Sequence, residues 1–137
     1  MADVRILLLM TCVLSLSACA GSPAAPGATV DERFTLAPGQ SIHVEPLDTT
    51  VQFVEVTGDS RCPGDALCIT GGDAIVRVRL FQGLAAATRE LHTGDASLAA
   101  VTWRGARVAL VELQPYPFSF RPILPEDYRA TMVVSQP

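Results

Sequence analysis

The 137-residue sequence is long enough for one domain, and its ten Arg against fourteen Asp plus Glu leave a formal net charge of −4. No stretch is strongly basic, so a nucleic-acid partner is not expected. The sequence contains no Lys, which excludes a Schiff-base lysine and a P-loop lysine.

The N-terminal residues have the pattern of a secretory signal. Arg5 precedes an apolar run over residues 6–16. Its length matches the apolar part of a signal peptide and falls short of the about 20 residues needed to span a bilayer. We expect residues 1–18 to be removed, and no later segment predicts a transmembrane helix.

The apolar run ends in Leu16-Ser17-Ala18-Cys19. These four residues resemble the lipobox of bacterial lipoproteins, which places an aliphatic residue and two small residues before an invariant cysteine. The resemblance implies cleavage before Cys19, acyl chains on its thiol and amine, and stable membrane anchoring. Ala20, in place of the Asp that retains lipoproteins in the inner membrane, implies the outer membrane facing the periplasm. An ordinary signal cut after Ala18 or Ala20 is the alternative.

Residues 19–30 are small, uncharged and rich in Pro and Gly, which predicts a flexible tether. Residues 31–137 form the predicted domain. Short alternating segments separated by turn residues predict eight strands and an all-β fold. We expect a single antiparallel β-sandwich, immunoglobulin-like or related, with a partly closed barrel as the alternative. The strands are predicted at residues 33–37, 41–45, 49–57, 74–82, 88–92, 98–103, 106–113 and 128–134.

Two of the predicted segments depart from simple alternation. The apolar phase shifts between Phe53 and Val54, which predicts a β-bulge. Residues 84–92 are ambiguous, because their alanines favour a helix while the segment lacks a good N-cap.

The four cysteines divide by compartment. Cys12 is lost with the signal and Cys19 carries the lipid, which leaves Cys62 and Cys68. Exported thiols meet an oxidising environment, so these two are expected to form a disulfide.

Asp59-Ser60-Arg61-Cys62-Pro63, four further residues, Cys68 and then Gly72 form the one motif in the body of the chain. This pattern resembles a group of small uncharacterised bacterial exported proteins and lipoproteins. The resemblance supports the fold and implies no activity. Relatives often have Trp two residues after the second cysteine, where this chain has Thr70.

Two interpretations of the cysteine motif follow. In the first it is a structural clamp, with Arg61 paired to Asp59 or to a buried carbonyl. In the second it is a binding loop of Arg61, Pro63, Gly64 and Asp65, and Arg61 is presented to a serine protease as an inhibitor presents its reactive residue.

Other groups do not predict a catalytic or metal site. His43 and His92 are far apart in sequence, and no residues show metal-ligand spacing. A serine hydrolase would need one of these histidines near a serine such as Ser60, but no serine lies in a nucleophile-elbow pattern. Asp59, Asp65 and Asp73 lie in or directly beside the motif, without the spacing of a calcium loop. We therefore expect no cofactor, no metal and no enzyme.

Residues 115–125 contain four prolines together with Tyr116, Phe118 and Phe120, which predicts an irregular crossing segment. We expect these rings to pack over an open edge of the core, with a polyproline-type binding ridge as the alternative. Trp103 is predicted to be a core or hairpin residue. Together these features predict a membrane-anchored, non-catalytic lipoprotein with a structural or protein-interaction role in the cell envelope. Its partners would be the membrane, through the lipid, and an envelope protein.

Overall fold

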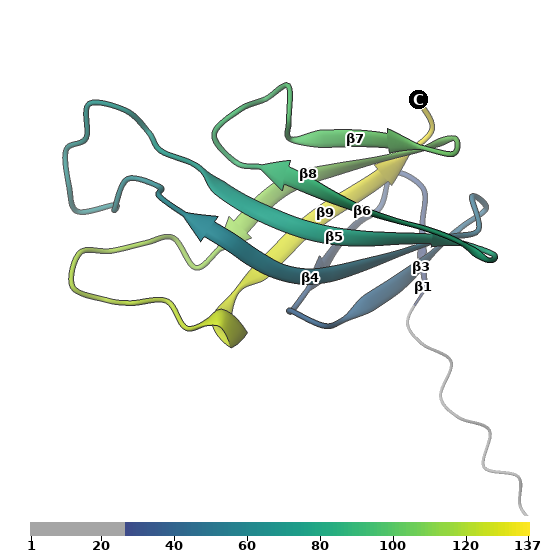
Figure 1. Cartoon of the computed structure of the whole chain (residues 1–137), viewed down its shortest axis with the longest axis horizontal. Helices are drawn as coiled ribbons and strands as arrows, with labels where there is room; N and C mark the ends of the chain where they lie inside the picture. Colours follow the sequence, from purple (N-terminus) through teal and green to yellow (C-terminus); the bar gives the residue numbers. More distant parts are fainter. Residues whose placement is uncertain (1–26) are drawn as a thin grey trace, which may run out of the picture.

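The computed structural model of the protein describes residues 27–137, and they form a β-sandwich of two separate sheets (Figure 1). This confirms the predicted fold class, and the sheets do not close into a barrel. The strands are β1 (Gly27–Thr29), β2 (Arg33–Leu36), β3 (Ser41–Glu45), β4 (Thr49–Asp59), β5 (Ala74–Gln82), β6 (Ala85–His92), β7 (Ala100–Trp103), β8 (Ala106–Gln114) and β9 (Arg129–Ser135), with a 3₁₀ turn, η1 (Pro125–Asp127), before β9.

The larger sheet has the strand order β1-β3-β4-β5-β6, and the smaller has the order β2-β9-β8-β7. All pairs are antiparallel except β1 with β3. Alternate residues of both sheets face one apolar core, and β2, β3, β5 and β9 bury every second side chain. Of the strands at the other edge of the sandwich, β6 buries only Leu91 and β7 buries no side chain. The fully buried core side chains include Phe53, Leu80, Leu91, Met132 and Val134.

The predicted bulge in β4 is confirmed. The β4–β5 register shifts between Phe53 and Glu55, and shifts again between Val56 and Gly58. Each shift adds a residue on one strand and bends it. β4 thus carries Asp59 beyond the core to the end of the sandwich.

The predicted tether is too long at its C-terminal end. Gly27–Thr29 forms β1, whose backbone pairs with β3, and the Val30 N–H donates to the Glu45 carbonyl at 3.0 Å. Ala28 is buried there. A strand at a sheet edge pairs through its backbone N–H and C=O groups, which every residue except proline has. The side chains of a run of small residues therefore do not reveal such pairing in the sequence. The signal, the lipobox and most of the tether lie outside the described residues.

The ambiguous segment after β5 is a strand. β6 pairs with β5 along its whole length, so the sheet edge overrides the helix preference of the alanines. The predicted hairpin joins β7 to β8 through Arg104 and Gly105, both at positive φ as a two-residue turn requires. Trp103 lies in this hairpin, partly buried against the core.

Two long connections lie side by side at one end of the sandwich (Figure 1). We call residues 60–73, between β4 and β5, the cysteine loop, and residues 115–128, between β8 and β9, the proline loop. The β5–β6 turn lies at the other end. Within residues 27–137, no helix has the length and apolar character to cross a membrane.

Candidate functional site

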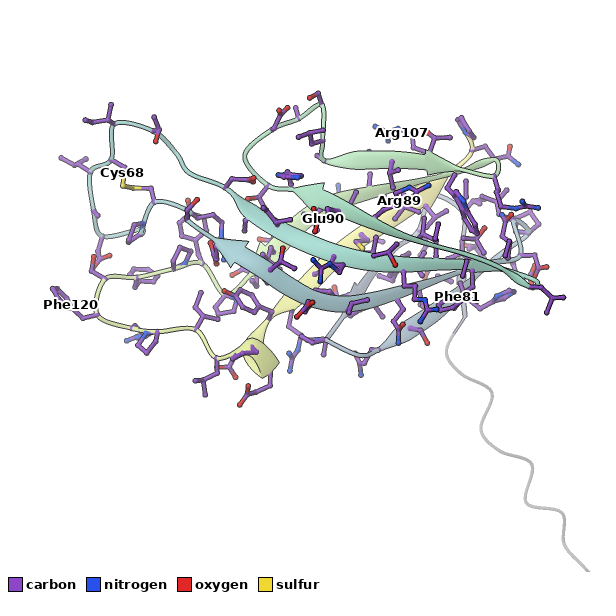
Figure 2. The ribbon with its side chains drawn as sticks, viewed as in Figure 1. Cys68, Phe81, Arg89, Glu90, Arg107 and Phe120 are labelled. Atoms are coloured by element: carbon purple, nitrogen blue, oxygen red, sulfur yellow. A yellow bond between two sulfur atoms is a disulfide. The ribbon has the colours of Figure 1, made fainter. Side chains whose placement is uncertain are left out.

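The cysteine loop is closed by the predicted disulfide. Cys62 and Cys68 are bonded, with their Cα atoms 5.9 Å apart, and this confirms the expectation (Figure 2). In the chain-entropy model a ring of this size stabilises the folded state by about 2 kcal/mol. The residues between the two cysteines are therefore held in a compact turn.

The proline loop packs directly on this ring. The Gly64 N–H donates to the Pro117 carbonyl at 2.9 Å, and the Ser119 N–H donates to the Asp65 carboxylate at 2.8 Å. A Cβ on Gly64 would lie 3.3 Å from the Phe118 ring, which explains the glycine. The two loops form one body.

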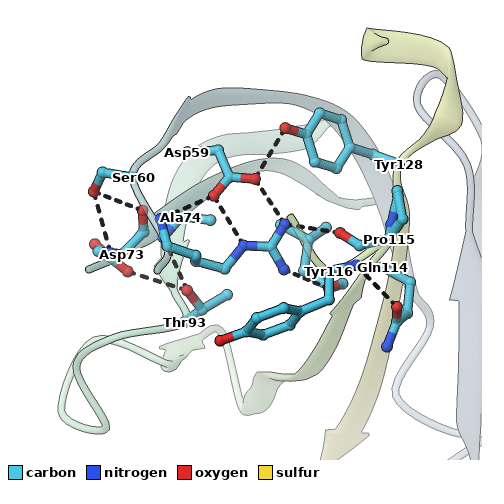
Figure 3. Close-up of polar contacts among 11 residues, drawn as sticks. Asp59, Ser60, Asp73, Ala74, Thr93, Gln114, Pro115, Tyr116 and Tyr128 are labelled. Carbon is cyan, nitrogen blue, oxygen red and sulfur yellow. Dashed lines mark hydrogen bonds and ion pairs between the residues drawn. The ribbon is translucent and has the colours of Figure 1, made fainter. Parts of the chain in front are cut away.

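Arg61 joins this body to the sandwich. Its Nε and Nη2 donate to the two carboxylate oxygens of Asp59 at 2.9 and 2.6 Å, a bidentate pair (Figure 3). Nη1 donates to the Leu113 carbonyl at 2.7 Å, and Nη2 also donates to the Pro115 carbonyl at 3.0 Å. The Tyr116 ring lies 5.4 Å from the guanidinium carbon. Four of the five guanidinium N–H groups have acceptors, and they link β4, β8 and the proline loop. We call Arg61 and Asp59 with these contacts the arginine clamp.

The electrostatics of the clamp favour the ion pair. Burial alone would raise the pKa of Asp59, but hydrogen bonds and charge from Arg61, with the Tyr128 hydroxyl donating at 3.0 Å, hold that pKa below its usual value. Burial, followed by the hydrogen bond to Asp59, raises the pKa of Tyr128 to about 12. Asp59 is therefore ionised and Tyr128 neutral at physiological pH.

The position of Arg61 bears on the interpretation of residues 61 and 63–65 as an inhibitory binding loop. Only 6% of the Arg61 side chain is exposed, so it is not presented to solvent as a reactive inhibitor residue must be. Pro63 is partly buried, while Gly64 and Asp65 are exposed. This geometry matches the structural interpretation of the motif, because the Arg61 side chain points inward and donates to backbone carbonyls at and after the end of β8. These carbonyls lie far from Arg61 in the sequence.

A second polar cluster closes the base of the cysteine loop. His92 Nδ1 lies 2.6 Å from Asp73 Oδ2, and the Gly94 N–H donates to Asp73 at 2.7 Å. Burial raises the pKa of Asp73, but these hydrogen bonds and the charge of His92 lower it more. Ser60 donates its hydroxyl to the Asp73 carbonyl. A Cβ on Gly72, which has a φ of +68°, would overlap the Ser60 carbonyl oxygen.

The histidines and aspartates occupy separate structural roles. His43, on β3, lies near Thr50 and Glu45, and two strands separate it from His92 on β6. Among residues 27–137, no group of three or more His, Cys, Asp or Glu side chains is placed to hold a metal ion.

A small cleft opens beside the clamp. Its volume is about 240 Å³, below the roughly 300–1,000 Å³ typical of small-molecule sites. Arg61, His92, Leu113 and Tyr116 contribute to its lining. The Arg61 donors are largely committed to protein acceptors, so this cleft lacks a free anchoring group of that kind.

The two loops expose several large apolar side chains, beside the exposed charged residues Asp65, Arg121, Glu126 and Asp127. Leu67, Ile69 and Phe120 are fully exposed, and Tyr116 and Phe118 are about half exposed at 48% each. The prediction that the aromatic side chains cover the core edge is therefore wrong for Phe120, which points away from the sandwich (Figure 2). From the proline loop, Tyr128 and in part Ile123 pack against the core instead. We call Leu67, Ile69, Phe118 and Phe120 the apolar tip.

Sequence reasoning missed Leu67 and Ile69. They flank Cys68, and residues 63–73 otherwise hold only Pro, Gly, Asp, Ala and Thr. Two branched aliphatic side chains in such a loop were the available signal.

The fold and site define an all-β sandwich with a clamped, disulfide-closed loop end. No protein-family model, curated protein or solved structure matches the chain.

Proposed function

We propose that this protein is a non-catalytic lipoprotein of the bacterial cell envelope, anchored through Cys19, which acts by contact through its loop end. The observation that carries the proposal is the pairing of a rigid base with an apolar surface. The arginine clamp and the disulfide hold the loops in place, while the apolar tip faces outward. Contiguous exposed apolar side chains mark interaction sites on soluble domains.

The anchor is proposed from the lipobox residues 16–19. Only seven residues lie between Cys19 and β1, so a lipid on Cys19 keeps the sandwich close to the membrane surface. Ala20 supports the outer membrane facing the periplasm as the location. Whether the role is structural or is binding to another protein, the contact is made through the loop end.

The anchor is tested by the intact mass of protein extracted from membranes. We expect a chain that begins at Cys19 and carries acyl groups, and a Cys19→Ala variant that is either released or left as uncut precursor. A mature chain that begins elsewhere and has a free thiol at Cys19 refutes the anchor.

The contact surface is tested separately with a photoreactive amino acid in the full chain. Position 69 lies in the apolar tip, and position 84, in the exposed β5–β6 turn, is the matched control because Leu84 is equally exposed at the other end. Crosslinks to envelope components are expected from position 69. Equal yields from both positions contradict a specific loop-end surface.

A further inference from the structure

We infer that the outer edge of β6 pairs with β6 of a second copy of this chain, so that the larger sheets of two molecules join across a two-fold axis at Thr88. This surface is separate from the apolar tip, and the inference does not depend on the lipid anchor.

β6 is the long edge strand of the sandwich (Figure 1). The other three edge strands, β1, β2 and β7, have three or four residues each, whereas β6 has eight. β6 pairs with β5 without a register shift and contains no proline. Short length, bulges and proline are common means by which proteins keep an edge strand from pairing, and β6 has none of these three.

Alternate residues of β6 direct their backbone groups away from β5. Gln82 and Ala85 flank a two-residue turn, so they form a hydrogen-bonded pair, and every second residue of β6 after Ala85 also bonds to β5. The intervening residues present their N–H and C=O groups outward, and they are Ala86, Thr88, Glu90 and His92. The His92 N–H already donates to the Leu98 carbonyl at 3.1 Å. Within residues 27–137, no strand pairs with this side of β6.

The outward backbone groups are complementary to themselves about Thr88. In an antiparallel pair, opposite residues that both point toward the partner strand exchange two hydrogen bonds. With Thr88 opposite Thr88 of the second copy, Ala86 lies opposite Glu90, and all three positions bond across the interface. A register moved by two residues in either direction sets the turn or the committed His92 opposite one of these positions, so fewer bonds form.

The side-chain sizes follow the same symmetry. In this register, each large side chain of residues 89–91 has an alanine opposite it: Arg89 faces Ala87, Glu90 faces Ala86 and Leu91 faces Ala85. The alanines leave room for the longer side chains of the second copy. Like charges directly opposite each other would be destabilising, and none occur in this register. A two-fold interface requires a surface that is complementary to itself, as this strand is.

The two charged side chains of β6 leave this edge able to pair (Figure 2). Glu90 accepts a hydrogen bond from Arg77 Nη2 at 3.2 Å on the face of the sheet away from the core, so its charge is already compensated. Arg89 Nη1 donates to the Thr88 carbonyl at 2.8 Å. A carbonyl oxygen has two lone pairs, so the Thr88 carbonyl is able to accept the N–H of the second copy as well.

The apolar core is also open along this edge of the sandwich. Of the β6 side chains only Leu91 is buried, and β7 buries none. Val101 and Trp103 of β7 pack against the core but are only partly buried. A two-fold axis perpendicular to the larger sheet keeps β7 of both copies on the same side of the joined sheet. Pairing therefore adds cover to apolar surface that a single sandwich leaves exposed.

Disulfide trapping in the full chain tests the pairing. Thr88→Cys places a thiol at the two-fold axis, where opposite Cα atoms of a hydrogen-bonded pair are about 5.5 Å apart, within reach of a disulfide. Thr35→Cys is the matched control, because Thr35 is also exposed on an edge strand, β2, at the far edge of the other sheet. Under a mild oxidant we expect a reducible product of twice the chain mass from Thr88→Cys, and no more from Thr35→Cys than from the parent protein.

Two further variants test the register. Ala86→Cys and Glu90→Cys should each give little product alone, because equivalent positions then lie four residues apart along the pair, about 13 Å at 3.4 Å each. Expressed together, they should form a mixed disulfide. Adding Thr88→Pro to both removes an outward N–H and keeps the bonds to β5, so the yield of the mixed product should fall several-fold.

Equal yields from Thr88→Cys and Thr35→Cys overturn the inference, as does a Thr88→Cys protein that stays monomeric while circular dichroism shows a folded sandwich. Strong product from Ala86→Cys alone overturns the assignment of the axis to Thr88. Where Thr88→Cys does not fold, the mixture of Ala86→Cys and Glu90→Cys decides the matter. The mass of the product distinguishes a second copy from any envelope component bound at the loop end, so failure here leaves the proposed loop-end contact standing.

Discussion

Replacing Arg61 with Ala removes the centre of the clamp and leaves the Asp59 carboxylate without its cation. Breaking one partner of a buried ion pair costs about 3–5 kcal/mol. The lower end, about 3 kcal/mol, is expected here because 12% of the Asp59 side chain is exposed and Tyr128 still donates to it. For a domain of this size, that loss lowers the melting temperature by about 10–15 °C.

Chemical denaturation of the wild-type and Arg61→Ala proteins measures this loss. Arg107→Ala is the matched control, because Arg107 is exposed on β8 and its loss should change stability by less than about 0.5 kcal/mol. A trypsin-inhibition assay on the wild-type protein is run beside it, and no inhibition is expected from a buried Arg61. Unchanged stability in Arg61→Ala, with tight inhibition by wild type alone, would refute the structural interpretation of the clamp.

The remaining predictions concern the loop base and the ionised groups. Cys62→Ser should lower the free energy of unfolding by about 2 kcal/mol, and thiol labelling of the native wild-type domain should find no free cysteine; ready labelling of native protein contradicts this. Gly72→Ala should destabilise far more than Gly83→Ala, measured by thermal unfolding, because both have positive φ but only Gly72 meets a neighbouring carbonyl; equal losses would contradict the close approach. The pKa of Asp59 is depressed in the folded state, so its contribution is present above the unfolded value near 4 and is lost as pH falls through the folded value; Asp59→Asn should flatten the acid limb of a stability–pH curve. The pKa of Tyr128 is raised to about 12, so its contribution is complete below about pH 10 and is lost as pH rises toward 12; Tyr128→Phe should flatten the alkaline limb, and an unchanged limb would assign the loss to another group.

Local patterning was sufficient for most of the sheet structure. The alternation of Val76, Val78 and Leu80 with Arg77 and Arg79 predicts β5 with the bounds that the structure shows. A strand with one buried face and one exposed face must alternate in this way, so its pattern is visible in a single sequence. The turn between β7 and β8 is equally local, because Gly105 supplies the positive φ that the hairpin needs.

Cysteine chemistry was also readable from the chain. Once Cys12 and Cys19 are assigned to the signal and the lipid, Cys62 and Cys68 have only each other as partners in the sequence, and the structure confirms the bond. The lipid itself stays a prediction.

Contacts between distant segments were not readable. The Arg61 acceptors on Leu113 and Pro115 lie more than fifty residues away and are backbone carbonyls, which every residue has. No side-chain pattern marks them. The same holds for β1, whose pairing with β3 uses backbone groups of Gly27 and its neighbours.

The sequence by itself thus determined the all-β class, nearly every strand and the disulfide, because alternation, turn residues and cysteine number are local or countable properties. Only the tertiary structure decided that Arg61 faces inward while Leu67, Ile69 and Phe120 face outward. The direction of a loop side chain depends on which acceptors and surfaces the folded sheets bring beside it. The cysteine loop and the proline loop are neighbours because β4 and β8 end at the same end of the sandwich, and that adjacency turns a short motif into a clamped surface.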